Sequence, residues 1–210
     1  MKNDNIRAKV RKLLDMAEMG TENERKVAME KVRELMQAHG ITEDQARLFT
    51  EETPAPIRKE KWLITLFDIC GQFSGVVSLT YRKKFEYVGD EIGVNVAQEL
   101  FCYLKNELKR KLKASKLKSL KAKKDFRMGF VIGVWENLEK AGGWRDMQEK
   151  SRQLTKKHFS HVREHHTRKM TVNPHFYNAG KTVGNDTNIN RQAGVSANAG
   201  YLEKKGANYE

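Results

Sequence analysis

Apolar residues recur at intervals of three and four over the first forty positions of the chain, which predicts two successive amphipathic helices. The first helix ends at Gly20 and the second at Gly40, because glycine commonly ends a helix. Thr21 and Glu24 stand three apart and form a capping box for the second helix. With a short third helix after it, the pattern predicts a helical hairpin domain over residues 1–50.

The spacing of the apolar residues changes after this domain. Residues 51–58 are a predicted linker, because Pro54 and Pro56 cannot continue a helix and hold the preceding residues extended. A helix is predicted over residues 59–71. Alternating apolar residues over 75–88 then predict a β-hairpin.

Long helices complete a module that spans residues 59–170. Asp90 is placed to cap the first of them, and two more are predicted over 125–140 and from 145 to about 169. The tail, residues 171–210, is rich in Asn and Gly and is predicted to be loop-rich, either disordered or ordered against another surface. The fold class is therefore α+β and mostly α: a helical hairpin, then a helix, a β-hairpin, long basic helices and a polar tail.

Small residues mark one side of the helix predicted over 125–140. Gly129 and Gly133 are four apart and permit close approach of another helix or of a ligand, and helix packing is the preferred interpretation. This glycine face, or the apolar stripe of Leu104 and Leu108, would serve a homodimer as readily as an internal core.

Positive charge gathers in two short stretches. The protein has 40 Lys and Arg against 27 Asp and Glu, a net charge of +13. Residues 105–124 hold ten basic residues and one acidic residue, and residues 150–170 hold seven and one. Such clustering creates a local positive potential that attracts a polyanion. Nucleic acid, DNA or RNA, is the expected partner, against the alternative of a solvated lysine-rich helix face.

Both basic stretches supply the expected phosphate contacts. The predicted nucleic-acid-binding residues are Lys105, Lys109, Arg110, Lys113, Lys116, Lys121, Lys156, Lys157, Arg163, Arg168 and Arg191. Exposed aromatic neighbours would stack on bases, and the candidates are Tyr81, Phe85, Tyr87, Phe159 and His161. Aromatic residues at period two are more typical of a core, because one face of a hairpin must be buried.

The N-terminal segments 6–17, 24–28 and 34–41 resemble a family of bacterial and phage proteins whose helical hairpin is known only as a domain of unknown function. A looser second module also resembles that family, with a Trp-led helix, a hairpin ending in 85–89 and the segment 126–130. The resemblance implies a phage or mobile-element context, and it implies no catalytic residues and no named chemistry.

The sharpest catalytic pattern is His161, Glu164 and His165, which matches the H-x-x-E-H motif of inverted zinc metalloproteases. The two histidines share a helical face, but the surrounding basic cluster opposes a dication, so no metal site is predicted and His161 and His165 stay as a weak alternative. Gly180-Lys181-Thr182 matches the end of a phosphate-binding loop, but His175 stands where its first glycine should be. Cys70 and Cys102 are too few for a disulfide framework and are expected to be buried.

These patterns predict a phage-type, non-enzymatic nucleic-acid-binding protein without a cofactor. The first alternative is a phage effector that uses residues 1–104 to bind and inhibit a host enzyme or defence complex. The second is a metal-dependent hydrolase at the histidine motif. The densest apolar run, Trp62–Phe67, is far shorter than a membrane span, and no secretory segment is apparent, so we expect the cytoplasm, that of the host cell if the protein is phage-encoded.

Overall fold

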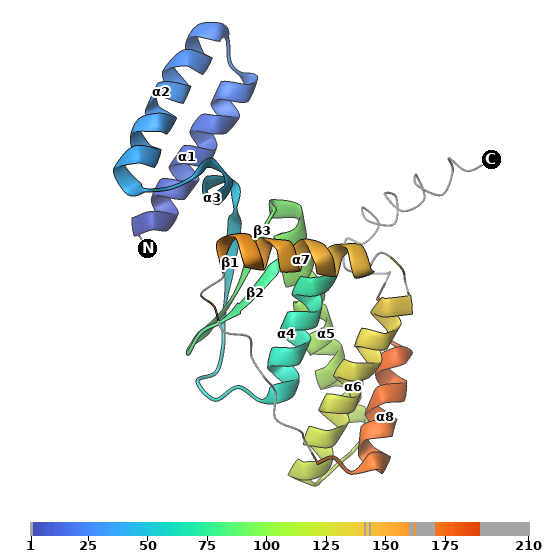
Figure 1. Cartoon of the computed structure of the whole chain (residues 1–210). Coiled ribbons are helices and arrows are strands. Elements are labelled where there is room, and N and C mark those ends of the chain that lie inside the picture. The colour runs from blue at the N-terminus through green and yellow to red at the C-terminus, as the bar shows by residue number, and fades with distance from the viewer. Residues whose placement is uncertain (1, 141, 143, 160–161, 163–170, 190–210) are drawn as a thin grey trace, which may run out of the picture. The chain divides into compact units, whose positions relative to one another are not determined.

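The computed structural model describes residues 2–140, 142, 144–159, 162 and 171–189. The described part is mostly helical with one small sheet, which confirms the α+β, mostly α class (Figure 1). The chain divides into two compact units, Met1–Phe49 and Thr50–Glu210, which are described separately below.

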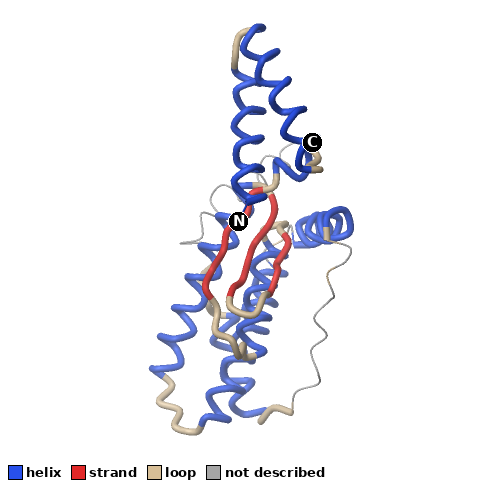
Figure 2. Tube along the Cα trace, turned by 90° about the vertical axis from the view of Figure 1, so that its left-hand side faces the viewer, coloured by secondary structure: helices blue, strands red, loops and turns tan. Residues whose placement is uncertain are grey.

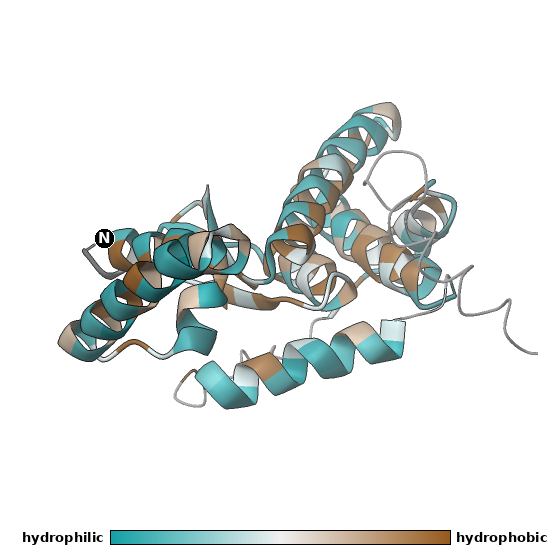
Figure 3. Ribbon diagram, turned by 90° about the horizontal axis from the view of Figure 1, so that it is seen from above, coloured by the Kyte–Doolittle hydropathy of each residue, from teal (hydrophilic) through white to brown (hydrophobic). Residues whose placement is uncertain are grey.

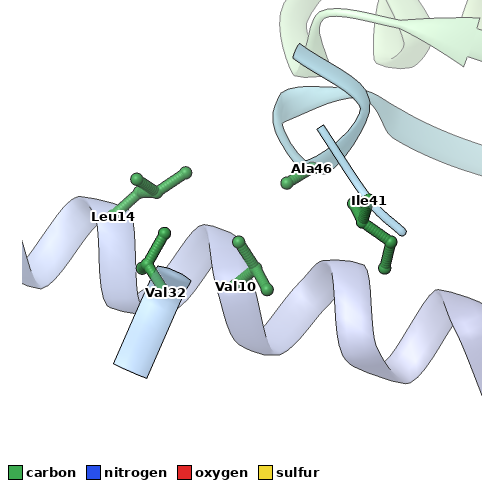
Figure 4. Packing of buried hydrophobic residues seen from close by; sticks show 5 residues of the cluster. All are labelled: Val10, Leu14, Val32, Ile41 and Ala46. Atoms are coloured by element: carbon green, nitrogen blue, oxygen red, sulfur yellow. The ribbon is translucent and has the colours of Figure 1, made fainter. Parts of the chain in front are cut away.

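The first unit is a helical hairpin closed by a short third helix. Its elements are α1 (Lys2–Met19), α2 (Glu22–His39) and α3 (Glu43–Arg47). Gly40 ends α2 in the left-handed conformation, with φ of 60°, as the sequence pattern predicts. Apolar residues from all three helices and the α2–α3 turn form the core (Figure 4): Val10, Leu14, Val32, Ile41 and Ala46. Arg11 connects α1 with the end of α3, because its Nη2 donates a hydrogen bond to the carbonyl oxygen of Leu48 at 3.0 Å.

The second unit is built on a three-stranded sheet of order β1-β3-β2 (Figure 2). Its strands are β1 (Phe49–Pro54), β2 (Val77–Thr80) and β3 (Lys84–Gly89). β2 and β3 form the predicted hairpin and pair antiparallel, with Val77 opposite Val88. β1 corrects the expectation of a linker over 51–58. Pro54 is tolerated there because it is the last residue of an edge strand.

Helices α4 (Lys61–Phe73) and α5 (Glu91–Ala114) supply the aromatic centre of this unit. The ring of Phe67 stacks on Phe85 and Tyr87, with centroids 4.4 and 4.0 Å apart, and Phe101 meets Phe67 edge-on. Gly71 lets β2 approach α4, because a Cβ there would clash with the hydroxyl of Ser78. The sheet residues Phe85 and Tyr87 are therefore core residues.

Helices α6 (Leu120–Lys140) and α8 (Pro174–Asn185) run side by side with their first residues at the same end (Figure 1). Gly129 and Gly133 on α6 face Gly180 and Gly184 on α8, and each lies against backbone of the other helix. The predicted role of the α6 glycines in helix packing is confirmed. The loop-rich tail expected from residue 171 instead contains α8, which lies on α6.

Helix α7 (Trp144–His158) packs beside β2 and the end of α4. Ser151 Oγ donates to the carbonyl oxygen of Val76 at 2.8 Å, and Lys150 Nζ lies 2.8 Å from the carboxylate of Asp90, the N-cap of α5. Hydrophilic residues cover most of this helix (Figure 3). None of the helices within the described residues has the length and apolar character needed to cross a membrane.

Candidate nucleic-acid interface

The end of α5 presents lysines on the side opposite its buried stripe. Leu104 and Leu108 are buried, whereas Lys109 and Lys113 are exposed and lie one turn apart. Cations near a helix C-terminus also interact favourably with its dipole, so this end of α5 tolerates the charge without an acidic neighbour.

Lys105 and Arg110 differ from these exposed lysines. Lys105 is half-buried, and its Nζ lies 5.3 Å from the centroid of the Phe101 ring. Arg110 pairs with Glu107 at 2.7 Å, and this hydrogen bond lowers the pKa of the carboxyl group. Both predicted contacts therefore have intramolecular partners of their own.

The turn between α5 and α6 centres on Lys116. Its φ is 52°, and among the described residues it alone occupies the left-handed region without being glycine. The conformation reverses the chain within a few residues and leaves Lys116, Lys118 and Lys121 exposed around the turn.

The first turns of α6 carry Lys121, Lys123 and Lys124, with no acidic residue in the first turn. A helix N-terminus is the positive end of the dipole and ordinarily favours Asp or Glu. The lysines and the dipole therefore attract anions to the same place. We name the seven lysines of this surface the basic junction: Lys109, Lys113, Lys116, Lys118, Lys121, Lys123 and Lys124.

The basic junction lies in a stretch of the sequence without acidic residues. The sequence holds none between Glu107 and Asp125. Asp125 is 2 % exposed, and its carboxylate accepts a hydrogen bond from the backbone N–H of Asn173 at 3.0 Å. In the part of the chain that the structure describes, no salt bridge joins the basic junction to a carboxylate.

A surface depression of about 380 Å³ lies at the start of α6. Its lining residues are Leu120, Lys121, Lys124, Asp125 and Thr171. Two of these lining residues are lysines, and a lysine binds a phosphate group as a point charge.

The second basic stretch lies elsewhere. Lys156 and Lys157 are exposed in the last turn of α7, whose Lys150 is paired with Asp90 at the start of α5. The 24 residues of α5 span about 36 Å, so α7 and the basic junction lie at opposite ends of this helix (Figure 1). The structure does not bring the described parts of the two basic stretches together.

Five residues singled out from the sequence lie outside the described residues: Arg163, Arg168, Arg191, His161 and His165. Among the described residues, no group of three His, Cys, Asp or Glu side chains is placed to hold a metal ion. Cys70 is buried and Cys102 is half-buried, and both are free. Burial raises the pKa of the Cys70 thiol well above its ordinary value.

The Gly180-Lys181-Thr182 segment lies inside α8 and not in a loop after a strand. Lys181 Nζ pairs with Glu136 on α6 at 2.7 Å, and Gly180 is pressed against the backbone of Phe126. These contacts give the segment a role in helix packing.

Comparison with known families reaches only the first unit. Residues 5–43 match the family model described as Protein of unknown function (DUF2786). The matched segment comprises most of α1, all of α2 and the start of α3, so the resemblance of the hairpin to a domain of unknown function is confirmed for those residues. Searches of the curated proteins and of the solved structures found no match. The matched residues do not include the basic junction, which therefore has to be interpreted from its own geometry.

Sequence reasoning omitted Lys118, Lys123 and Lys124 from the predicted contacts. For Lys123 and Lys124 the sequence did offer a signal. Together with Lys121 they begin a helix that has no acidic residue in its first turn, whereas a helix N-terminus ordinarily favours Asp or Glu. The contact of Lys105 with Phe101 joins residues one turn apart on α5, so helix spacing offered a signal that separates Lys105 from Lys109.

Proposed function

We propose that the protein is a non-enzymatic nucleic-acid-binding protein whose basic junction contacts backbone phosphates without sequence specificity. The observation that supports this is a surface of seven lysines at the adjoining ends of two helices, with the nearest acidic residues in the chain, Glu107 and Asp125, already engaged. The phage or mobile-element context implied by the sequence resemblance belongs to the same proposal.

The physical basis is release of counterions from the polyanion. Each phosphate neutralised by a lysine adds about 0.9 to the slope of log affinity against log salt for duplex DNA, and about 0.7 for a single strand. A compact group of lysines on rigid helix ends keeps its charges together without ordering a loop on binding. The uncompensated start of α6 gains most, because a bound phosphate satisfies the helix dipole as well as the lysines.

The test is a salt series of binding to labelled DNA and RNA, single- and double-stranded, by fluorescence anisotropy. The test variant replaces four lysines of the basic junction by Gln: Lys109, Lys113, Lys116 and Lys121. A matched control replaces four exposed lysines of the N-terminal helical hairpin by Gln: Lys9, Lys12, Lys26 and Lys31. Both variants lose the same net charge.

We expect the salt slope to fall by about 2 to 4 in the test variant, and to change by less than about 1 in the control. An equal decrease of the salt slope in both variants would mean that the net charge of the protein, and not the basic junction, attracts the nucleic acid. Absence of binding by the unaltered protein at low salt would reject the proposal.

A second candidate function is a phage effector that binds a host protein. Apolar side chains exposed on the N-terminal helical hairpin favour it: Met16 is 55 % exposed, Met19 87 % and Val27 54 %. Capture of one host protein in a salt-insensitive manner, lost in a Met16→Ser, Met19→Ser variant, would support it. Loss of nucleic-acid binding in that same variant would instead assign these residues to the first function.

A further inference from the structure

The turn of the β-hairpin is a further basic surface. It lies outside the two stretches of the sequence, 105–124 and 150–170, in which positive charge gathers. Tyr81 and Lys84 close the turn through a hydrogen bond from Tyr81 N to the carbonyl oxygen of Lys84 at 2.9 Å. Arg82 and Lys83, between them, are exposed. Lys59 stabilises the turn, since its Nζ donates hydrogen bonds to the carbonyl oxygens of Tyr81 at 2.5 Å and of Arg82 at 2.9 Å.

Tyr81 stands apart from the other aromatic residues. Its side chain is 44 % exposed, and among the Phe, Tyr and Trp residues that the structure describes it is alone in the exposed class. The stacking candidates Phe85 and Tyr87, at 1 % and 0 %, are core residues, and Phe159 is half-buried. The register of the hairpin explains the difference, because Thr80 pairs with Phe85 and the next residue, Tyr81, therefore lies on the opposite face from Phe85 and Tyr87.

The Tyr81 ring contacts a cation on one face. Lys84 Nζ lies 4.8 Å from its centroid, over the ring, and Lys84 is itself paired with Glu86 at 3.2 Å and with Glu52 on β1. A tyrosine phenol ordinarily has a pKa of about 10, so the ring is neutral at neutral pH; partial burial and the charge of Glu86 raise the pKa of the Tyr81 phenol further. An exposed, neutral aromatic ring next to cations has the chemistry of a base-stacking platform.

Side-chain contacts connect this turn with α6. Next to Lys59, the carboxylate of Glu60 accepts from Arg127 Nη1 at 3.1 and 3.2 Å, and the Arg127 guanidinium lies 5.5 Å from the ring of Trp62. Arg127 is one turn beyond the lysines that begin α6. The hairpin turn and the α5–α6 turn also point toward the same end of the second unit in two perpendicular views (Figures 1 and 2).

We propose that Tyr81 stacks on an unpaired base, and that Arg82 and Lys83 hold the adjoining phosphates, so that the protein prefers single-stranded nucleic acid. This inference rests on the proposed function and adds a substrate class to it. In a duplex the bases are stacked on one another and offer no face to a side chain, whereas a single strand exposes them. Lysines alone bind either form, so the preference depends on the ring.

The experiment measures binding of the full-length protein to an oligothymidine strand, an oligouridine strand and a duplex of equal length. Tyr81→Ala removes the ring, and Tyr81→Phe keeps it while removing the hydroxyl. We expect Tyr81→Ala to weaken single-strand binding by roughly 5- to 150-fold, the range measured when stacking aromatics are replaced by alanine. Tyr81→Phe retains binding within about threefold, and duplex binding is unchanged in both variants.

A photocrosslink gives a readout independent of affinity. A strand that carries 5-iodouracil reacts on irradiation with an aromatic side chain stacked on that base, and the modified peptide is identified by mass spectrometry. We expect the crosslink at Tyr81, and its loss in Tyr81→Ala. Equal thermal unfolding of the two Tyr81 variants excludes misfolding as the cause.

The outcomes separate the two proposals. If the unaltered protein binds and the Lys→Gln variant of the basic junction loses affinity, but Tyr81→Ala binds single strands like the unaltered protein, the stacking role is wrong and the proposed function stands. Equal loss of duplex and single-strand binding in Tyr81→Ala also contradicts a stacking role. If the unaltered protein binds no nucleic acid, the proposed function itself fails.

Discussion

Gly129 on α6 lies against the carbonyl oxygen of Tyr177 on α8 so closely that a Cβ atom at Gly129 would stand 1.9 Å from that oxygen, far inside van der Waals contact. The contact is backbone against backbone, so no side chain can rotate away to make room. Ala is a better helix former than Gly by about 1 kcal/mol, but overpacking costs about 1–3 kcal/mol or more. We therefore expect Gly129→Ala to separate α8 from α6 in spite of its gain in helix propensity.

The measurement is hydrogen exchange of the α8 amides, followed by mass spectrometry. In Gly129→Ala we expect exchange in residues 174–185 to be at least tenfold faster, with the sheet residues little changed, since a detached α8 loses its tertiary support. Asn178→Ala, on the exposed side of α8, is the control and leaves exchange unchanged. Unaltered protection in Gly129→Ala would mean that α8 does not depend on this contact.

The same pair of helices shows what the sequence could and could not predict. The spacing of Gly129 and Gly133 indicated a close helix contact, because that requirement is local to one helix. The partner α8 was not predicted, because its Gly180 and Gly184 weaken helix propensity and its stability comes from packing on α6. β1 was missed for a similar reason: Pro54 argues against a strand in general but not at the end of an edge strand.

The candidate site was predictable in charge but not in arrangement. Ten basic residues within 105–124 identified the surface, because electrostatic clustering needs only the sequence. The distance between this stretch and α7 depends on where Lys150 meets Asp90, which is a tertiary contact. The exposure of Tyr81 beside the burial of Phe85 likewise follows from the stacking of Phe67 on one face of the sheet.

Lys116 combines a strained backbone conformation with a proposed phosphate contact. Its φ of 52° costs a lysine roughly 1–2 kcal/mol, which glycine avoids, while glycine adds about 0.4–1 kcal/mol of entropy to the unfolded chain. We expect Lys116→Gly to be more stable by up to about 1 kcal/mol, measured by urea unfolding, and to bind nucleic acid with a salt slope lower by about 0.7–0.9.

Two further variants at this position separate the causes. Lys116→Asn tolerates the left-handed conformation and also lacks the charge, so it resembles Lys116→Gly in both properties. Lys116→Ala lacks the charge but keeps the strain, so it binds weakly without gaining stability. Equal stability of all three variants would show that the turn relaxes away from the left-handed region.

From the contacts of Asp90 we predict that the free energy of unfolding falls at acidic pH. Partial burial opposes its ionisation, but hydrogen bonds from Lys150 Nζ and from the N–H of Gly93 outweigh burial and lower the pKa of Asp90. Since the folded pKa is lowered, the stabilisation is present above the unfolded value of about 3.9 and is lost as the pH falls through the folded value. We expect urea unfolding to show this loss as the pH falls below about 4.

Two substitutions resolve the roles of Asp90. Asparagine is also a good N-cap, so Asp90→Asn retains the cap of α5 and loses the charged pair, which is half-exposed and contributes about 0.2–1 kcal/mol. Asp90→Ala loses the cap as well, for about 1 kcal/mol more at neutral pH. A stability profile of Asp90→Asn parallel to that of the unaltered protein below pH 4 would contradict the assignment.

From the burial of Tyr87 we predict that the free energy of unfolding also falls at alkaline pH. Burial raises the pKa of its phenol well above the ordinary value of about 10, and its hydroxyl donates to the carbonyl oxygen of Phe67 at 2.8 Å. The folded state keeps this proton while the unfolded chain releases it near pH 10. The stabilisation is therefore complete below about pH 10 and is lost as the pH rises toward the folded value.

Tyr87→Phe removes both the hydrogen bond and the titration. At pH 7 we expect it to be less stable by about 0.5–1.5 kcal/mol, because a buried hydrogen bond is lost while the ring still stacks on Phe67. Above pH 10 the unaltered protein loses stability faster than Tyr87→Phe, so the two free energies of unfolding converge or cross. Urea unfolding at pH 7 and at about pH 11 measures both differences. A constant difference at the two values would mean that Tyr87 ionises equally in the folded and unfolded states, against its burial between α4 and α5.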